Sequence, residues 1–219
     1  MLELLIVFAF GVLVFWSLNA NLKNKDIKVF PRRISDRLGQ LWDIAHEGMR
    51  ENRFLRAEKA LLTILKIDSK NAPAYNRLGI LYAKQKEYKD AIDCFEIASS
   101  IQPTASSLHN LGLIYYETEN YEKAAIAFEQ ALKLEDNLAA RHIAYAKVQE
   151  KLGNHKLMID ELEKAVELEP NKESYSLLKK AYNDLGLAAE ADQIEDKLKK
   201  ISSVAGKPKR ILRPRRVVI

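Results

Sequence analysis

Apolar residues in the stretch 38–201 recur three or four positions apart, and this whole pattern returns after every 33 or 34 residues. Gly79 and Gly112 lie 33 residues apart, and Ala131 and Ala165 lie 34 residues apart. Spacing of three or four predicts amphipathic helices. A longer period of this length indicates one supersecondary unit that is repeated along the chain.

The repeated positions carry residues of matching size. Gly79 and Gly112 leave room for a neighbouring helix, and Phe95 and Phe128 are large enough to fill that room. Pro103 follows the second apolar stretch of its unit and cannot continue a helix. A single helix pair cannot bury its own apolar face, so the units are expected to stack into a solenoid.

Two adjacent segments match at many positions: YNRLGILYAKQKEYKDAIDCFEIASSIQP from Tyr75 and LHNLGLIYYETENYEKAAIAFEQALKLED from Leu108. They resemble the tetratricopeptide repeat family, whose unit is a helix-turn-helix of this length. The resemblance implies an all-α fold, a right-handed superhelical solenoid of antiparallel helix pairs. We predict a solenoid over residues 38–202 with about five repeats: 38–71, 72–104, 105–138, 139–171 and 172–202.

The outer repeats depart from the pattern. Ala45 and Gly48 stand where the first repeat should have glycine and tyrosine, and His142 takes an aromatic position in the fourth. Glu195 takes the large apolar position of the fifth repeat. Such decay is expected where the outer face of a solenoid meets water, and it leaves the exact repeat count at the ends open.

Residues 1–20 form an uncharged apolar stretch apart from Glu3. As a helix they would be about 30 Å long, the thickness of a bilayer core, which predicts one N-terminal transmembrane helix. A cleaved secretory signal fits less well, because no basic n-region precedes the stretch and no small-residue cleavage site follows it. The third interpretation of residues 1–20 is a buried helix of a soluble protein.

Residues 21–37, expected to be a juxtamembrane linker, carry six basic and two acidic groups. The positive-inside rule then places the N-terminus outside and the repeats in the cytoplasm. The lone cysteine, Cys94, implies no disulfide framework. We therefore expect a single-pass protein of a bacterial inner membrane. Bacterial envelope-assembly regulators and mitochondrial import receptors have a similar layout, with the anchor first and the repeats after it.

The net charge of +5 is unevenly distributed. Residues 41–198 have a net charge of −6, whereas residues 199–219 hold eight basic groups and no acid. We expect residues 203–219 to be a disordered basic tail that contacts lipid or phosphate. Its candidate contact residues are Lys207, Lys209, Arg210, Arg213, Arg215 and Arg216. Anionic lipid is favoured because the anchor is near, and nucleic acid or the ribosome is the alternative, although the tail has no aromatic residue to stack on bases.

The sequence predicts no catalytic, metal or cofactor site, and so no enzyme. None of the four histidines has a partner at metal-ligand spacing, and no phosphate-binding, dinucleotide-binding or nucleophile-elbow motif occurs. His142 and His155 are expected to pack, and Cys94 to be a small buried thiol. The pair Glu161 and Glu163 is expected to lie on a solvated helix face beside lysines.

In the resembling family the first helices of successive repeats line a groove, which implies a set of partner-contacting positions. These are Trp42, His46, Arg50, Asn76, Ile80, Lys84, His109, Leu113, Tyr116, Ile143, Lys147 and Lys151. Their mixture of aliphatic and basic side chains suits a protein or peptide partner with acidic residues. Ile80 and Leu113 stand where relatives that grip chaperone carboxylates have polar residues, which disfavours that role. We expect a membrane-anchored adaptor or scaffold. The alternative interpretation is that these positions carry ordinary solvated side chains.

Overall fold

The computed structural model describes residues 31–205, with side chains described as far as Ile201. The chain divides into two compact units, one ending at Asp43 and one beginning at Ile44. Within residues 31–205, no helix has the length and apolar character needed to cross a bilayer. The predicted transmembrane segment 1–20 and the contact residues of the tail lie outside the described residues, so both stay predictions.

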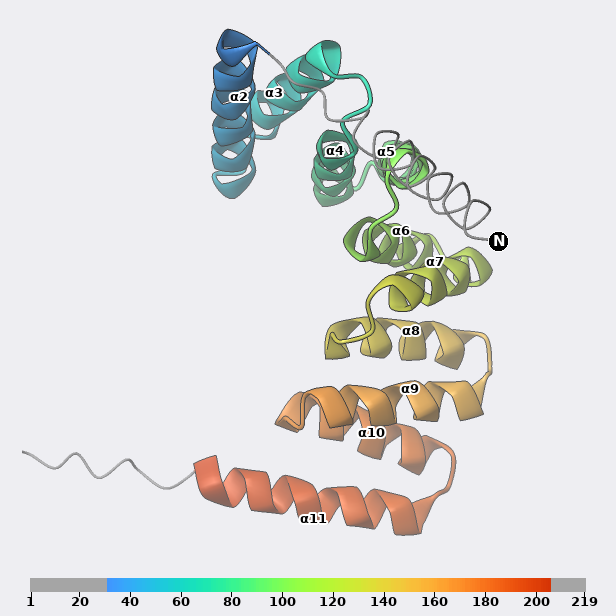
Figure 1. The fold of residues 1–219 in the computed structure, drawn as a ribbon. Helices are drawn as coiled ribbons and strands as arrows, with labels where there is room; N and C mark the ends of the chain where they lie inside the picture. Colours follow the sequence, from blue (N-terminus) through green and yellow to red (C-terminus); the bar gives the residue numbers. More distant parts are fainter. Residues whose placement is uncertain (1–30, 206–219) are drawn as a thin grey trace, which may run out of the picture. The chain divides into compact units, whose positions relative to one another are not determined.

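The described residues form ten helices and no strand, as an all-α solenoid requires. Each predicted repeat corresponds to one helix pair, although the first helix begins before residue 38 and the last ends after residue 202, and the repeat boundaries themselves stay predictions. Figure 1 shows the helices of the second unit following one another in chain order. Their bounds are α2 (Arg32–Arg50), α3 (Phe54–Ile67), α4 (Ala72–Gln85), α5 (Tyr88–Ile101), α6 (Ala105–Glu117), α7 (Tyr121–Leu134), α8 (Ala139–Lys151), α9 (His155–Leu168), α10 (Lys172–Asp184) and α11 (Ala188–Ala205).

Helix α2 begins at Arg32, inside the segment expected to be a linker. Pro31 directly precedes it, and the Pro31 carbonyl accepts backbone hydrogen bonds from Ile34 and Ser35. Proline suits the start of a helix because its fixed φ is helical and its missing N–H is not needed there. The described part of the first unit is therefore Pro31 and residues 32–43 of α2.

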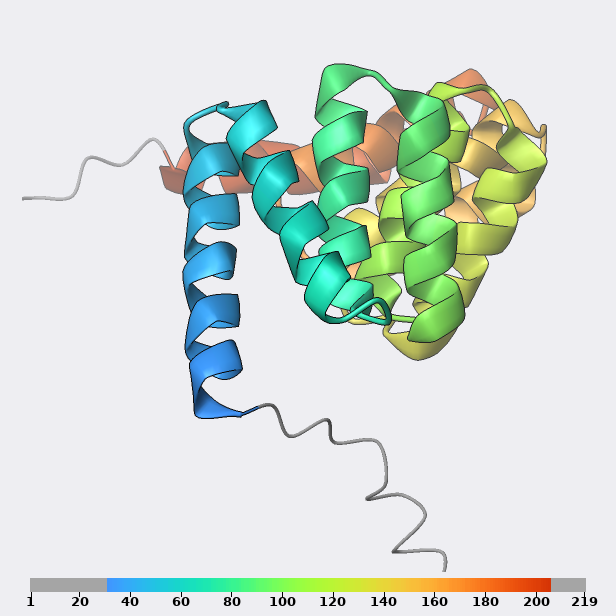
Figure 2. The ribbon, with the colours of Figure 1, turned by 90° about the horizontal axis from the view of Figure 1, so that it is seen from above.

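In two of the pairs, α4 with α5 and α6 with α7, the helices pack closely through the predicted small residues. A Cβ atom built on Gly79 would lie 2.7–2.8 Å from ring carbons of Phe95, and one on Gly112 would lie 2.9 Å from ring carbons of Phe128. Both phenylalanine side chains are buried. The roles predicted for these glycines and phenylalanines are thus confirmed. Figure 2 shows α4 and α5 side by side, and α6 and α7 pair in the same way.

The turn inside each pair places one residue in the left-handed region. These residues occupy the same position of successive repeats: Asn52 (φ 57°), Lys86 (φ 64°), Glu119 (φ 58°), Gly153 (φ 74°) and Gly186 (φ 73°). Only two are glycines, so the other three have a backbone conformation that costs a residue with a Cβ atom. The turn geometry is therefore kept even where the sequence does not favour it.

Adjacent repeats are joined by hydrogen bonds from a tyrosine to a glutamate of the preceding second helix. The pairs are Tyr82 with Glu58, Tyr115 with Glu96 and Tyr182 with Glu163. Burial, followed by the neighbouring carboxylate, raises the pKa of each tyrosine above its ordinary value. The hydroxyls therefore stay protonated donors, and each bond fixes one repeat against the next.

Candidate partner-binding groove

The first helices of neighbouring repeats form one continuous layer, here called the first-helix face. Helix α6 contacts both α4 and α8, and Asn110 Nδ2 donates to Asn76 Oδ1 over 3.4 Å. On the other side, a cavity of about 460 Å³ opens between the second helices α7 and α9. The opening between α8 and α10 on the first-helix face is only about 40 Å³. The first helices are thus the more closely spaced layer.

The aliphatic positions predicted for the groove lie on this face. Ile80 and Ile143 are half-buried, and Leu113 is 39% exposed. Tyr116 is half-buried, and its ring meets the ring of Tyr121 edge-on at a centroid distance of 5.6 Å. These side chains are fixed by the core beneath them and still present apolar surface.

The 40 Å³ opening, here called the α8–α10 cleft, has apolar walls and a charged rim. Its walls are Ile143, Ala146, Met158, Leu162, Leu177 and Ala181. Its rim consists of Lys147, Glu150, Lys180 and Asp184. This cleft is large enough for the tip of one apolar side chain. Sequence reasoning placed Ile143 and Lys147 here but did not identify Leu177 or Lys180, although Lys180 continues the register of Lys147 one repeat later.

Four basic side chains at predicted groove positions are exposed and form no ion pair with other described residues. They are Arg50, Lys84, Lys147 and Lys151. Lys180 differs, because its Nζ lies 3.8 Å from Glu150 and 4.0 Å from Asp184. Away from this face several basic groups are held by acids, such as Arg141 by Glu135 at 2.7 Å. The first-helix face therefore keeps cations available to a partner.

His109 is half-buried at its predicted groove position. Its ring packs against Phe128 at a centroid distance of 5.3 Å, and its buried Nδ1 has no hydrogen-bond partner among the described residues. Burial, followed by the charge of Arg141, lowers the pKa of His109. A buried lone pair costs less than a buried N–H without an acceptor, so we assign the proton of the neutral ring to Nε2.

The remaining predicted positions contribute differently. His46 is exposed on the second half of α2, and Asn76 is half-buried and bonded to Asn110 as described. Trp42 is half-buried and belongs to the first unit. The assignment of all twelve residues to a partner-binding groove stays a prediction.

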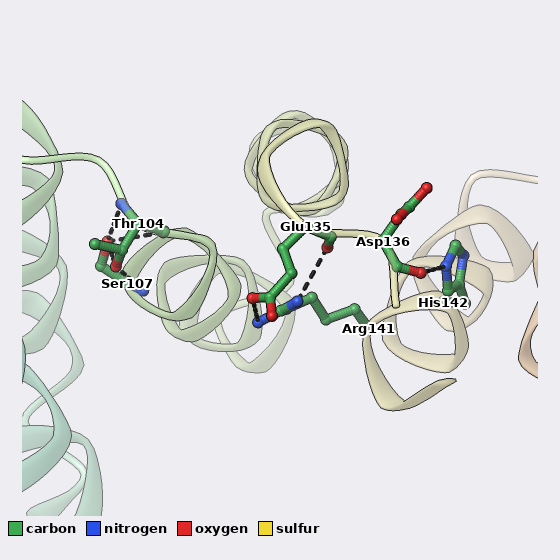
Figure 3. Close-up of polar contacts among 6 residues, drawn as sticks. All are labelled: Thr104, Ser107, Glu135, Asp136, Arg141 and His142. Atoms are coloured by element: carbon green, nitrogen blue, oxygen red, sulfur yellow. Dashed lines mark hydrogen bonds and ion pairs between the residues drawn. The ribbon is translucent and has the colours of Figure 1, made fainter. Parts of the chain in front are cut away.

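A buried polar cluster corrects one expectation. Glu161 was expected on a solvated face, but it is only 3% exposed. Its Oε2 lies 2.6 Å from His142 Nδ1, and its Oε1 accepts from Lys164 Nζ over 2.8 Å. His142 Nε2 lies 2.8 Å from the Asp136 carbonyl oxygen, as Figure 3 shows. Both ring nitrogens of His142 thus face acceptors, and the cluster ties α8 and α9 to the connection between α7 and α8.

A second anchor holds the same turn. Figure 3 shows Arg141 donating to the Glu135 backbone carbonyl, over 3.0 Å, and to the Glu135 carboxylate. It also shows Thr104 and Ser107 bonded to each other at the start of α6. Each of these contacts pairs polar groups at the junction between two repeats. None of these side chains is arranged as a catalytic group.

The described side chains contain no group of three or more His, Cys, Asp or Glu residues that could hold a metal ion. Cys94 is buried, as expected. Burial, followed by the charges of Asp90 and Asp93, raises the pKa of its thiol to about 11. A thiol with so high a pKa is almost entirely protonated at neutral pH and is a poor nucleophile.

A family model described as "Tetratricopeptide repeat" matches residues 70–137 and 103–169. The middle of the chain therefore carries tetratricopeptide repeats. No curated protein sequence matches the chain. The confirmed part of the sequence-based prediction is an all-helical solenoid of this repeat type.

Solved structures agree with that fold. A crystal structure of MamA is 22% identical with a TM-score of 0.72, covering 82% of this chain and 100% of that chain. MamA 41-end from Desulfovibrio magneticus RS-1 is 15% identical, with a TM-score of 0.70 and coverage of 78% and 98%. YrrB, titled a TPR protein with an unusual peptide-binding site, is 21% identical, with a TM-score of 0.63 and coverage of 73% and 83%. At these identities the likeness concerns the fold alone.

Proposed function

We propose that the protein is a membrane-anchored, non-catalytic adaptor that binds an acidic protein or peptide along its first-helix face. The observation that carries this proposal is the α8–α10 cleft, where apolar walls lie directly beside the unpaired cation of Lys147. A segment that alternates apolar and acidic side chains complements that arrangement. YrrB, a structure of the same fold, is described as having a peptide-binding site.

Apolar and charged contacts play different parts in this binding. Burying one leucine or isoleucine side chain contributes about 1.5–3 kcal/mol. An exposed ion pair contributes about 0.2–1 kcal/mol and is screened by salt. Ile80, Leu113 and the cleft beside Ile143 therefore set how long a partner stays bound. The unpaired lysines mainly speed its arrival and select for acids.

The membrane part of the proposal rests on residues 1–20. Their apolar length favours a single-pass anchor in a bacterial inner membrane, with the N-terminus outside and the repeats in the cytoplasm. Such an anchor confines the groove and its partner to one surface and raises their effective concentration. It makes an adaptor useful even when each contact with the partner is weak.

Site-specific photo-crosslinking in native membranes tests the groove. A crosslinker at Leu113 should capture a partner that one at Leu55 does not, although Leu55 on α3 is 64% exposed. Exchanging both Lys84 and Lys151 for Glu should weaken that capture and reduce its dependence on salt. The matched control exchanges Lys89 and Lys156 of the second helices, which changes the charge equally and should leave capture intact. Capture that follows neither position nor charge would refute the groove.

Deleting residues 203–219 separates this proposal from association with nucleic acid or the ribosome through the tail. Loss of the partner in the truncated protein, with capture unchanged in the Lys84 and Lys151 variant, would show that the tail is the binding site. Replacing Ile80 and Leu113 by Ser should instead speed dissociation while leaving the salt dependence of association unchanged.

A further inference from the structure

The second helices leave a cavity of about 330 Å³ between α9 and α11, here called the α9–α11 cleft. Its floor includes three buried apolar side chains, Val166, Leu178 and Ile194. Its lining carries three acids and one base: Glu163, Glu167, Glu190 and Lys197. An apolar floor with a mainly acidic rim matches a segment that combines aliphatic and basic residues.

No described basic side chain neutralises these acids. Glu167 and Glu190 are exposed and form no ion pair within the described residues. Glu163 accepts a hydrogen bond from the Tyr182 hydroxyl over 2.6 Å, and that donor is neutral. The Nζ of Lys197 lies over the Tyr175 ring, 5.8 Å from its centroid. The rim therefore has a net negative charge that a bound cation would lower.

The chain itself contains the complement to this cleft. Residues 207–216 hold six basic groups and no acid, with Ile211 and Leu212 at their centre. They follow α11 after a single residue, so covalent linkage gives them a high local concentration at this end of the solenoid. The tail need not search for the cleft as a separate molecule would.

The residues after Ala205 are long enough to reach the cleft. Ile194 lies 11 residues before Ala205, which is about 16 Å back along α11 at 1.5 Å per residue. Ile211 lies six residues after Ala205 and can reach about 20 Å in an extended chain. Glu190 lies about 22 Å back, and Arg213 can reach about 26 Å.

We propose that residues 207–216 fold back along α11 and bind in the α9–α11 cleft of the same chain. Ile211 and Leu212 cover the floor of Val166, Leu178 and Ile194, and the basic residues lie beside the three glutamates. While bound there, the segment is withheld from anionic lipid and from nucleic acid. A strongly anionic surface competes for it, so the cleft regulates when the tail is free. This inference does not depend on a partner in the groove.

Trypsin provides a direct test, because its cleavage sites lie within the segment. In the full chain at about 50 mM salt, cleavage after Lys209, Arg210, Arg215 and Arg216 should be at least about fivefold slower than at about 500 mM. When the segment leaves and re-enters the cleft faster than trypsin cuts, the cleavage rate is proportional to the fraction of molecules whose segment is undocked. Exchanging Glu167 and Glu190 for Lys should remove the protection. Exchanging Asp93 and Glu122, exposed acids of α5 and α7, should preserve it.

A zero-length carbodiimide crosslink gives a second measurement that does not depend on cleavage rates. Lys207 or Lys209 should join Glu163, Glu167 or Glu190, identified by mass spectrometry of the full chain. Equal cleavage in all variants, or crosslinks spread over acids of every helix, would overturn the proposal. So would crosslinks found only between isotopically distinct copies, since they would place the segment on a second molecule.

Discussion

Adding one methyl group at Gly112 measures how closely the paired helices pack. The new Cβ atom would lie 2.9 Å from three carbons of the Phe128 ring, whereas ordinary contacts begin near 3.4 Å. The ring must therefore move by about 0.5 Å. Phe128 is 1% exposed, and the His109 ring packs against it. The ring has no open space into which it can move.

Two effects of opposite sign set the size of the change. Overpacking a filled core costs about 1–3 kcal/mol. Alanine favours a helix over glycine by about 0.8–1 kcal/mol, which offsets part of this cost. We expect Gly112→Ala to be destabilising by about 0–2 kcal/mol. Gly39 supplies the matched control, because a Cβ atom there would meet nothing within 4 Å. Gly39→Ala should stabilise its helix by up to about 1 kcal/mol.

Urea unfolding followed by far-UV circular dichroism measures both variants in the full chain. The difference between the two substitutions removes the propensity term and should be about 1–3 kcal/mol. Gly112→Leu should cost more than Gly112→Ala, because a longer side chain must displace α7. Equal unfolding midpoints for Gly39→Ala and Gly112→Ala would refute the close approach on which the repeat alignment depends.

Further predictions follow from other features. Lys86→Gly and Glu119→Gly should each raise stability by up to about 1 kcal/mol by relieving a left-handed backbone, read as a higher melting temperature; no rise in either would contradict that turn geometry. Since the pKa of His109 is lowered, the unfolded state binds its proton first as pH falls below 6.5, and stability should fall there. His109→Gln should flatten this dependence in urea titrations, and an unchanged slope would argue against it. Removing residues 1–20 should release the protein from carbonate-washed membranes, whereas a full chain already soluble would exclude the anchor.

The solenoid was predictable because its packing repeats at fixed sequence positions. Gly79 with Phe95 and Gly112 with Phe128 are the same contact one period apart, so one spacing in the sequence specifies many contacts in the structure. Helix ends were less predictable. Nothing in the hydrophobic period distinguishes residues 32–37 from a linker. Helix α2 includes them because Pro31, directly before it, favours a helix start and no glycine occurs between Arg32 and Gly39.

The backbone conformations of the turns could not be predicted, for a different reason. Gly153 and Gly186 signal a left-handed residue, but Lys86 and Glu119 adopt the same conformation with no local signal. Each lies between two helices whose packing determines where the chain must reverse. Tertiary contacts therefore impose the backbone angle, and local preference only sets its cost.

Polar pairing is the part of the structure that periodicity cannot supply. The register of the repeat places His142 at a packed position, but it does not show that Glu161, which was expected on a solvated face, meets it from another helix. The same limit applies to the groove. Lys147 and Lys180 occupy equivalent positions on the rim of one cleft, yet of the two only Lys180 lies within 4.0 Å of the carboxylates of Glu150 and Asp184. A residue's face follows from its place in the repeat, whereas its availability to a partner depends on neighbours that are not repeated. The cations that remain unpaired on the first-helix face are accordingly the ones whose reversal is worth testing first.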